Sequence, residues 1–260
     1  MPQLSIITIN YNNKGGLEKT LNSVFNQSCQ DFEYIVIDGA STDGSRKLIE
    51  KNSDKIDYWV SEPDKGIYNA MNKGIHASNG EYLLFLNSGD WLYEDETILK
   101  ALPLLKNEDI IYGLSQICTA ASLGALINPN PKLTLYGMGY KRNSLPHQST
   151  FFKRSLMVEY GGYDERYKIV SDWAFYMIAI FKNNCSYKKI DNIISYFNAE
   201  GLSYTSEGFK LIAVERKLVM EENFKMLYND FLMYDEMKNY LEKYSSRKFL
   251  LKSLVKSFFR

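Results

Sequence analysis

The fold is decided by residues 81–91, which read Glu-Tyr-Leu-Leu-Phe-Leu-Asn-Ser-Gly-Asp-Trp. Tyr82 to Leu86 is an unbroken apolar run, too short to span a membrane and long enough for a strand that is covered on both faces. Asn87-Ser88-Gly89 is typical of a turn, and Asp90 follows it directly. We therefore expect a central strand of a largely parallel sheet, with Asp90 at its carboxyl edge, where open α/β sheets bind ligands. Asp90 is either a metal ligand there or the cap of a helix over residues 94–105.

Length and charge limit what the rest of the chain can be. The 260 residues suffice for one large domain, or for one domain with an appendage. Lysine plus arginine (31) equals aspartate plus glutamate (31), so no overall field attracts nucleic acid and we expect no nucleic-acid partner. We find no secretory leader and no apolar run long enough to cross a membrane, and we therefore expect a cytoplasmic protein. The isolated Cys29, Cys118 and Cys185 are expected to be reduced thiols with no role.

Two strand-and-loop units precede the central strand. Leu4 to Ile9 is apolar and β-branched, and a loop over residues 10–16 leads to a helix over 17–26. A dinucleotide site would require G-x-G-x-x-G in this loop, so the adjacent glycines at 15 and 16 argue against a dehydrogenase. The second strand, residues 33–37, ends at Asp38, where a carboxylate can contact a nucleotide's ribose or base. The alternative is that Asp38 only closes a turn before the next helix.

A third strand over residues 56–61 leads to a helix that begins near Ile67. Ile67, Met71 and Ile75 recur every four residues and predict one apolar helix face that covers the sheet. Lys65 before this helix and Lys73 within it can place cations near a diphosphate, or can be ordinary solvated side chains.

The second half of the chain has weaker patterns. Residues 110–112 and 115–118 predict strands, and Asn-Pro-Asn-Pro at 128–131 breaks any element there, so we expect a loop on the acceptor side. His147 precedes a short strand over 151–153 and is either functional or structural. Asp172 and Trp173 open a helix over 174–181, and Asp172 is either a cap or a functional carboxylate. A last strand over 192–197 precedes a helical region beyond Gly208.

Five segments in this order, residues 5–12, 35–45, 65–75, 87–90 and 171–173, resemble the family 2 glycosyltransferases of the GT-A fold, especially bacterial enzymes that build polysaccharides from nucleotide sugars. The resemblance covers residues 4 to about 203. It implies an α/β, Rossmann-like GT-A domain over residues 1–205, with a mixed, mostly parallel sheet and flanking helices, and a C-terminal helical extension over 206–260.

The resemblance also assigns roles to residues. The family's metal-binding D-x-D motif falls on Ser88-Gly89-Asp90, so only Asp90 keeps a carboxylate, and Gly89 has no side chain to contact the ribose. The catalytic base maps to Asp172, with Ser171 in place of the acid that precedes it in relatives. The nucleotide residues implied are Ile9, Tyr11, Asp38, Lys65, Asn72, Lys73, Ser88 and Gly89, and the acceptor-side residues are His147 and Trp173.

The implied reaction transfers a sugar from a nucleotide-sugar donor to a glycan or lipid-linked saccharide, with inversion at the anomeric carbon. We expect the donor to be UDP-linked. Mg²⁺ or Mn²⁺ on Asp90 would stabilise the departing diphosphate, and Asp172 would deprotonate the acceptor hydroxyl. The alternative within this fold is a catalytically idle nucleotide-sugar-binding protein or scaffold that has lost D-x-D.

The C-terminal tail carries one further pattern. Lys248, Lys252, Lys256 and Arg260 recur every four residues beside apolar positions, and no acidic residue intervenes. A helix with such faces can lie on an anionic membrane surface, so we expect residues 247–260 either to bind the inner face of the cell membrane or to pack on the domain.

Overall fold

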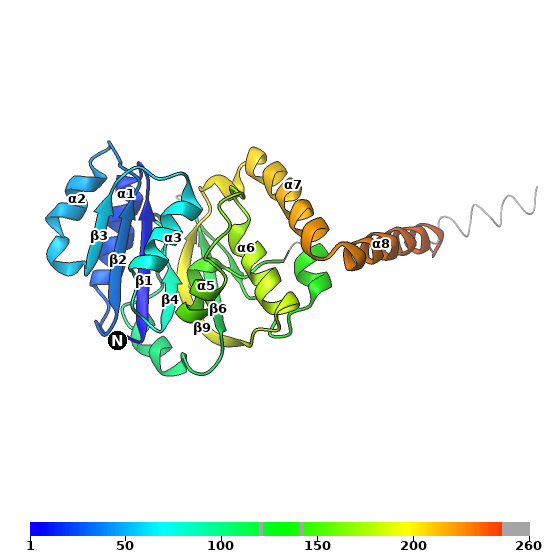
Figure 1. Cartoon of the computed structure of the whole chain (residues 1–260), viewed down its shortest axis with the longest axis horizontal. Helices are drawn as coiled ribbons and strands as arrows, with labels where there is room; N and C mark the ends of the chain where they lie inside the picture. Colours follow the sequence, from blue (N-terminus) through cyan, green and yellow to red (C-terminus); the bar gives the residue numbers. More distant parts are fainter. Residues whose placement is uncertain (120–121, 141–142, 246–260) are drawn as a thin grey trace, which may run out of the picture.

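The computed structural model of the chain describes residues 1–119, 122–140 and 143–245. Its centre is a nine-stranded mixed sheet with helices on both faces (Figure 1). The strand order is β3-β2-β1-β4-β8-β6-β9-β5, and β7 pairs with β6 outside this path. The expected α/β architecture is therefore present.

The N-terminal part of the sheet is parallel and carries the predicted central strand. It consists of β1 (Leu4–Asn10), β2 (Glu33–Asp38), β3 (Tyr58–Ser61) and β4 (Tyr82–Phe85). Alternate side chains of each strand enter two separate cores. Ile7, Ile35 and Leu83 belong to one core, whereas Ile6, Val36 and Leu84 belong to the other. This division explains why the strands read as continuous apolar runs, because both faces are covered.

The helices between these strands cover the two faces. Helices α1 (Lys14–Phe25), α2 (Ser45–Lys51) and α4 (Thr97–Ala101) contribute to one core, and α3 (Ile67–Ala77) contributes to the other. Helix α1 begins at Lys14 rather than at the predicted Leu17, because the Asn13 side chain accepts a hydrogen bond from the Gly16 N–H at 3.1 Å and caps it.

The C-terminal part of the sheet is built from strands of both directions. β8 (Thr150–Lys153) lies antiparallel between β4 and β6 (Ile110–Cys118), and β9 (Tyr187–Asn198) runs parallel to β6. The two short strands predicted within residues 110–118 form one strand. Gly113 lies at its centre, where a Cβ atom would be 2.6 Å from the Ile194 side chain. The last strand is longer than the predicted 192–197 because its first residues continue the pairing with β6.

Several short elements complete the domain. Of these, β5 (Trp91–Leu92), β7 (Leu123–Ile127) and α5 (Arg154–Glu159) had no clear sequence signal. The helix predicted over 174–181 is present as α6 (Ser171–Tyr176), which continues as a π-helical turn over Met177–Lys182. Short 3₁₀ turns occur at Ser53–Lys55, Leu102–Leu104, His147–Ser149 and Leu202–Tyr204, and a π turn occurs at Tyr136–Tyr140.

Two helices form the C-terminal extension. In α7 (Ser206–Asn223), Val219 and Met220 are buried in the same core as α3, whereas α8 (Lys225–Ser245) projects from the body of the molecule (Figure 1). The predicted boundary at residue 205 therefore precedes a helix that shares the core of the sheet domain. In the part of the chain that the structure describes, no helix is both long and apolar enough to span a membrane. The predicted amphipathic tail, residues 247–260, lies outside the described residues.

Candidate active site

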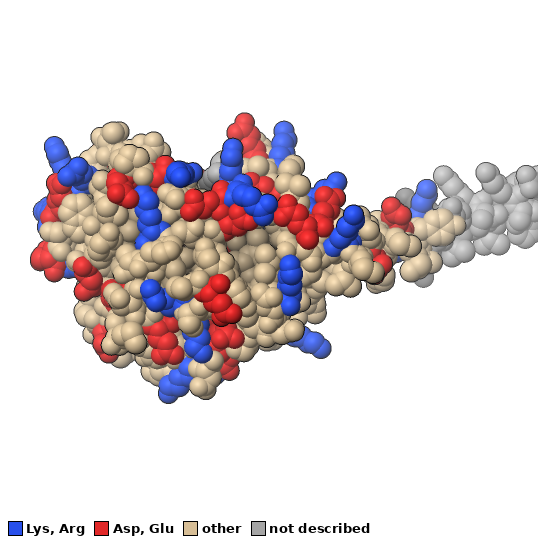
Figure 2. Space-filling model, viewed as in Figure 1, with Lys and Arg blue, Asp and Glu red and all other residues tan. Residues whose placement is uncertain are grey.

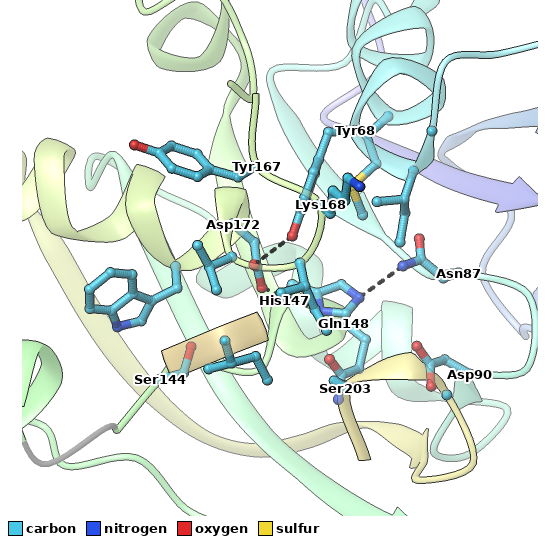
Figure 3. Close-up of a pocket in the computed structure, with 18 of the residues that line it drawn as sticks. Tyr68, Asn87, Asp90, Ser144, His147, Gln148, Tyr167, Lys168, Asp172 and Ser203 are labelled. Atoms are coloured by element: carbon cyan, nitrogen blue, oxygen red, sulfur yellow. Dashed lines mark hydrogen bonds and ion pairs between the residues drawn. The ribbon is translucent and has the colours of Figure 1, made fainter. Parts of the chain in front are cut away.

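A large cavity opens beside the carboxyl ends of the parallel strands. Its volume is about 1240 Å³. Its walls come from the start of α3, the loop after β4, the turn around His147, the loop that leads into α6, and α7 (Figure 3). Residues far apart in the sequence therefore meet in one place, at the sheet edge where the sequence predicted a site.

Asp90 forms part of one wall of this cavity. Its side chain is only 5% exposed, and its Oδ1 accepts a hydrogen bond from the Asn198 N–H at 2.9 Å. Burial raises the pKa of Asp90 to about 7, against the opposing effect of the Asn198 hydrogen bond. The helix-cap alternative is wrong, because the next helix begins at Thr97 and Glu96 occupies its N-cap position.

The surroundings of Asp90 are neutral. Gly89 has φ of 106°, and a Cβ at this position would lie 3.4 Å from the amide nitrogens of both Asn13 and Asn198. Asn13 Nδ2 also donates to the Ser88 carbonyl at 3.0 Å. No cluster of three His, Cys, Asp or Glu side chains that could hold a metal occurs among the described residues. A buried carboxylate with one hydrogen bond and no cationic partner among the described residues fits a cation whose remaining ligands are substrate and water oxygens.

Asp172 lies in the first turn of α6 and forms part of another wall. Its Oδ1 accepts a hydrogen bond from the Tyr68 hydroxyl at 3.1 Å, and its Oδ2 is 3.8 Å from His147 Nδ1 (Figure 3). About a fifth of the side chain (20%) is exposed. The N-cap position of α6 is Val170, and no side chain caps the helix, so the cap alternative for Asp172 is also wrong.

Two uncharged side chains, the Tyr68 phenol and the His147 imidazole, face the Asp172 carboxylate. Burial, and then the charge of Asp172, hold the pKa of Tyr68 well above its usual range, so the phenol keeps its proton. Burial lowers the pKa of His147, although Asp172 opposes this effect, so the imidazole is neutral at pH 7. The Asn87 amide nitrogen lies 3.1 Å from His147 Nε2, and the other ring nitrogen, Nδ1, faces Asp172.

The predicted nucleotide residues divide into two groups. Lys65 and Ser88 line the cavity, whereas Asp38 lies outside its lining and is fully buried. Asp38 accepts four hydrogen bonds, from Asn10 Nδ2, the Ser41 N–H, and the hydroxyls of Ser41 and Ser61. Burial acts to raise the pKa of Asp38, but these bonds outweigh it and hold the pKa below its usual value.

The remaining predicted residues have different surroundings. Ile9 is buried, and Tyr11 is 67% exposed at the end of β1. Asn72 is buried and pairs with the backbone of Tyr163 through both ends of its amide. Lys73 forms an ion pair with Glu62 at 2.8 Å. The cavity lining includes neither Asn72 nor Lys73.

Trp173 and several residues without a sequence signal complete the site. Trp173 is 1% exposed, lines the cavity and donates from Nε1 to the Met138 carbonyl at 3.2 Å. Tyr68 and Asn87, which contact the two polar side chains at the centre, were not identified from the sequence. Nothing in a single sequence marks Tyr68, whose partner Asp172 is 104 residues away.

Charge over the molecule is mixed. Acidic and basic side chains are interspersed on the face shown in Figure 2, as the balanced composition predicts. Cys29, Cys118 and Cys185 are free thiols, as expected.

Comparison with known proteins gives both a family and a fold. The family model described as Glycosyl transferase family 2 matches residues 5–153. A relative from Mycobacterium tuberculosis (strain H37Rv), the PGL/p-HBAD biosynthesis glycosyltransferase Rv2957, is 30% identical over 213 residues, which are 78% of this chain and 80% of the relative. The resemblance and the glycosyltransferase class expected from the sequence are confirmed, and the dehydrogenase alternative is wrong.

Two solved structures confirm the fold. Staphylococcus aureus TarS 1-349 in complex with UDP-GlcNAc matches with a TM-score of 0.64 at 19% identity, over 85% of this chain and 67% of that chain. The mannosyltransferase PcManGT from Pyrobaculum calidifontis, in complex with GDP-Man and Mn²⁺, matches with a TM-score of 0.59 at 17% identity, over 88% of this chain and 64% of that chain. The predicted GT-A fold is therefore confirmed.

Proposed function

The chain belongs to glycosyl transferase family 2, and on this premise we propose that it is an inverting glycosyltransferase. It transfers a sugar from a UDP-linked donor to a glycan or lipid-linked saccharide in cell-surface polysaccharide synthesis. The named ligands of the two solved structures, UDP-GlcNAc and GDP-Man, support a nucleotide sugar as the donor class. The M. tuberculosis relative, whose name assigns it to PGL/p-HBAD biosynthesis, supports a role in building a glycan.

One observation carries this proposal: Asp90 and Asp172 line the same cavity in opposite chemical surroundings. Asp90 is buried and has a single hydrogen bond from the backbone, which suits a residue that meets a cation and a diphosphate. Asp172 is partly exposed, accepts a hydrogen bond from the neutral Tyr68 hydroxyl and faces the neutral His147 imidazole, which suits a residue that accepts a proton.

In the proposed reaction Asp172 is the general base. It takes the proton of the acceptor hydroxyl while the hydroxyl oxygen forms a bond to the anomeric carbon of the donor sugar. The bond between that carbon and the diphosphate oxygen breaks, and its electron pair leaves with the nucleoside diphosphate. The configuration of the carbon is therefore inverted in a single step, without a covalent enzyme intermediate. Tyr68 and neutral His147 orient the carboxylate without adding a positive charge that would weaken it as a base.

Asp90 is the residue that would hold Mg²⁺ or Mn²⁺. Such a cation supplies stabilisation for the negative charge that develops on the departing diphosphate. The Mn²⁺ named with PcManGT supports a divalent ion for this fold. Ser88 and Asn198 add neutral polar groups beside Asp90, and Lys65 offers a cation on the cavity wall.

We propose that the nucleotide base lies against Tyr11, near Ile9 and Asp38, with Gly89 allowing close approach of the ribose. All four acceptor positions of Asp38 are used inside the protein. Recognition of a base N–H by Asp38 therefore requires that one serine hydroxyl, at Ser41 or Ser61, gives up its bond. This exchange is reasonable for a hydroxyl, because it can rotate toward water or ligand.

The experiment that tests this function is a screen for nucleotide release. The chain is incubated with UDP-, GDP- and dTDP-sugars, with Mn²⁺, Mg²⁺ or chelator, and the free nucleoside diphosphate is measured. We expect release from UDP-sugars that depends on the divalent ion. Release from no donor, by a chain that binds nucleotide sugars in calorimetry, would favour the idle scaffold instead.

We also propose that the protein lies at the inner face of the cell membrane through residues 247–260. The support is the sequence pattern of this tail, where each lysine near an anionic surface contributes roughly 1 kcal/mol. Co-sedimentation with vesicles containing anionic lipid tests it, by comparing the full chain with a chain that ends at Ser246. We expect the shorter chain to lose binding at low salt. Equal binding by both chains would assign membrane attachment to another part of the protein.

A further inference from the structure

Helix α7 holds the backbone that leads into the proposed base. Glu215 of α7 is only 6% exposed, and its two carboxylate oxygens accept hydrogen bonds from the Lys168 N–H at 2.9 Å and the Ile169 N–H at 3.1 Å. These amides precede Asp172 by four and three residues. A buried carboxylate that accepts two backbone N–H bonds is held firmly, because either bond lost would leave a buried charge less well compensated.

The opposite end of the same loop is held by α3. Asn72 pairs with both backbone groups of Tyr163, and Glu165 accepts hydrogen bonds from the amides of Asn69 and Asn72. Residues 164–170 are therefore fixed between α3 at one end and α7 at the other. Helix α3 also supplies Tyr68, which bonds to the Asp172 carboxylate itself.

Helix α7 also contacts the residue that follows the base. The Arg216 guanidinium lies over the Trp173 ring at 4.6 Å from its centroid, a cation–π distance. Trp173 is fixed in turn by its hydrogen bond to the Met138 carbonyl. Adjacent residues of α7, Glu215 and Arg216, thus contact the chain on both sides of Asp172.

We propose that Glu215 is a positioning residue for Asp172, so that the C-terminal extension is part of the catalytic apparatus. The inference rests on the proposed function, in which Asp172 is the general base. Glu215 is not among the residues that line the cavity; it fixes the start of α6 and hence the direction of the Asp172 carboxylate. Loss of this hold displaces the base from the acceptor hydroxyl, and small displacements of a catalytic group can reduce rates about 100-fold.

Two variants of different severity test the proposal. Glu215→Gln replaces one oxygen by an NH₂ group that faces a backbone N–H, so one hydrogen bond is lost and two donors oppose each other. Glu215→Asp keeps the charge but is one methylene shorter, and it is the variant to use if the glutamine protein fails to fold. Glu221→Gln is the matched control, because Glu221 is a half-exposed acid on the same helix.

The measurements separate positioning from stability. We expect turnover by Glu215→Gln to fall about 10- to 100-fold at saturating donor, and by Glu215→Asp less, with donor affinity in calorimetry unchanged. Glu221→Gln should behave as the wild type. Glu215→Gln should have little further effect on turnover in an Asp172→Asn background, because the group that it positions is no longer a base.

Four outcomes would overturn the inference. Full turnover by folded Glu215→Gln would show that catalysis does not need the two hydrogen bonds between Glu215 and the backbone of Lys168 and Ile169. Losses that multiply in the double variant, or a fall in donor affinity and melting temperature without a fall in turnover, would assign Glu215 to stability alone. If the wild type itself turns over no nucleotide sugar, the proposed function fails and the positioning role fails with it. If the wild type is active, a negative result with the Glu215 variants contradicts only the positioning role of Glu215.

Discussion

The two carboxylates of the cavity differ in how the protein holds them. The Asp90 carboxylate accepts its hydrogen bond from a backbone group, the Asn198 N–H, and the Thr20 hydroxyl donates to the Asp90 backbone carbonyl at 2.6 Å. Asp172 is surrounded by side chains, with the Tyr68 hydroxyl at 3.1 Å and His147 Nδ1 at 3.8 Å. The first arrangement leaves a buried charge in need of a cation, and the second provides one hydrogen-bond donor and one neutral neighbour around a base.

This difference also gives the two walls opposite responses to pH. Burial raises the pKa of Asp90 to about 7 and lowers the pKa of His147, since in both residues it disfavours the charged form. Asp90 becomes charged as pH rises, whereas His147 becomes charged as pH falls. Without a cation, the charged Asp90 therefore lowers the stability of the folded protein at high pH. The charged His147 lowers it at low pH.

The largest expected effect comes from removing the proposed base. Asp172→Asn keeps the shape of the side chain and an oxygen that accepts from Tyr68, but it cannot take a proton. We expect transfer to fall on the order of 10²-fold or more, while donor affinity measured by calorimetry stays unchanged. The control is Asp191→Asn, because the Asp191 side chain is 94% exposed and lies outside the cavity lining. Loss of donor affinity in Asp172→Asn would show that another residue is the general base. Asp90 and Asp172 would then not have the different roles proposed for them.

The second effect concerns the other wall. Asp90→Asn should weaken donor binding in the presence of Mn²⁺ by about 10- to 100-fold, as expected for the loss of one charge-assisted interaction. In the metal-free protein at pH 8 the same variant should raise the melting temperature, because it removes a buried charge that has no cationic partner in the described part of the chain. Calorimetry and thermal melts measure the two effects. Unchanged donor affinity with Mn²⁺ would contradict the assignment of Asp90 to the metal.

The parts of the molecule that the sequence predicted are those that depend on local pattern. Tyr82 to Leu86 reads as a strand covered on both faces because its alternate side chains enter two cores, and Asp90 is found at the cavity because it follows that strand by one turn. The two-residue strand β5 (Trp91–Leu92) was missed, since its pairing with β9 depends on residues about a hundred positions later.

Side-chain partners across the cavity could not be predicted from one sequence. Asn87 was identified only as a turn residue, yet its amide contacts the imidazole of His147, which is 60 residues away. Glu215 reads as an ordinary helix glutamate, although it accepts backbone hydrogen bonds 47 and 46 residues earlier in the chain. Asn72 was expected at the nucleotide, but both ends of its amide pair with the Tyr163 backbone. These contacts depend on packing of distant segments, on which local patterns carry no information.

The smallest expected effect tests the pH response of the His147 wall. His147→Gln keeps an oxygen that can accept from the Asn87 amide and removes the titrating ring. The unfolded chain takes up a proton at His147 near its ordinary pKa of 6.5, whereas the folded protein does so only at lower pH. Stability that depends on neutral His147 is therefore present above pH 6.5 and is lost as pH falls below it. Between pH 7 and pH 5, we expect the wild type to lose more melting temperature than His147→Gln.

The wild type must be compared with His147→Gln because Asp90 changes the stability of the folded protein in the opposite direction over much of the same pH range. As pH falls from 7 toward the unfolded value of 3.8, protonation of Asp90 stabilises the folded wild type and hides part of the loss at His147. The difference between wild type and His147→Gln removes the Asp90 contribution, since both proteins contain it. His76→Gln is the control, because His76 is the other histidine of the chain and is exposed on α3. If the melting temperatures of all three proteins depend on pH equally, His147 titrates as in the unfolded chain. The proposed opposite effects of Asp90 and His147 on stability would then be contradicted.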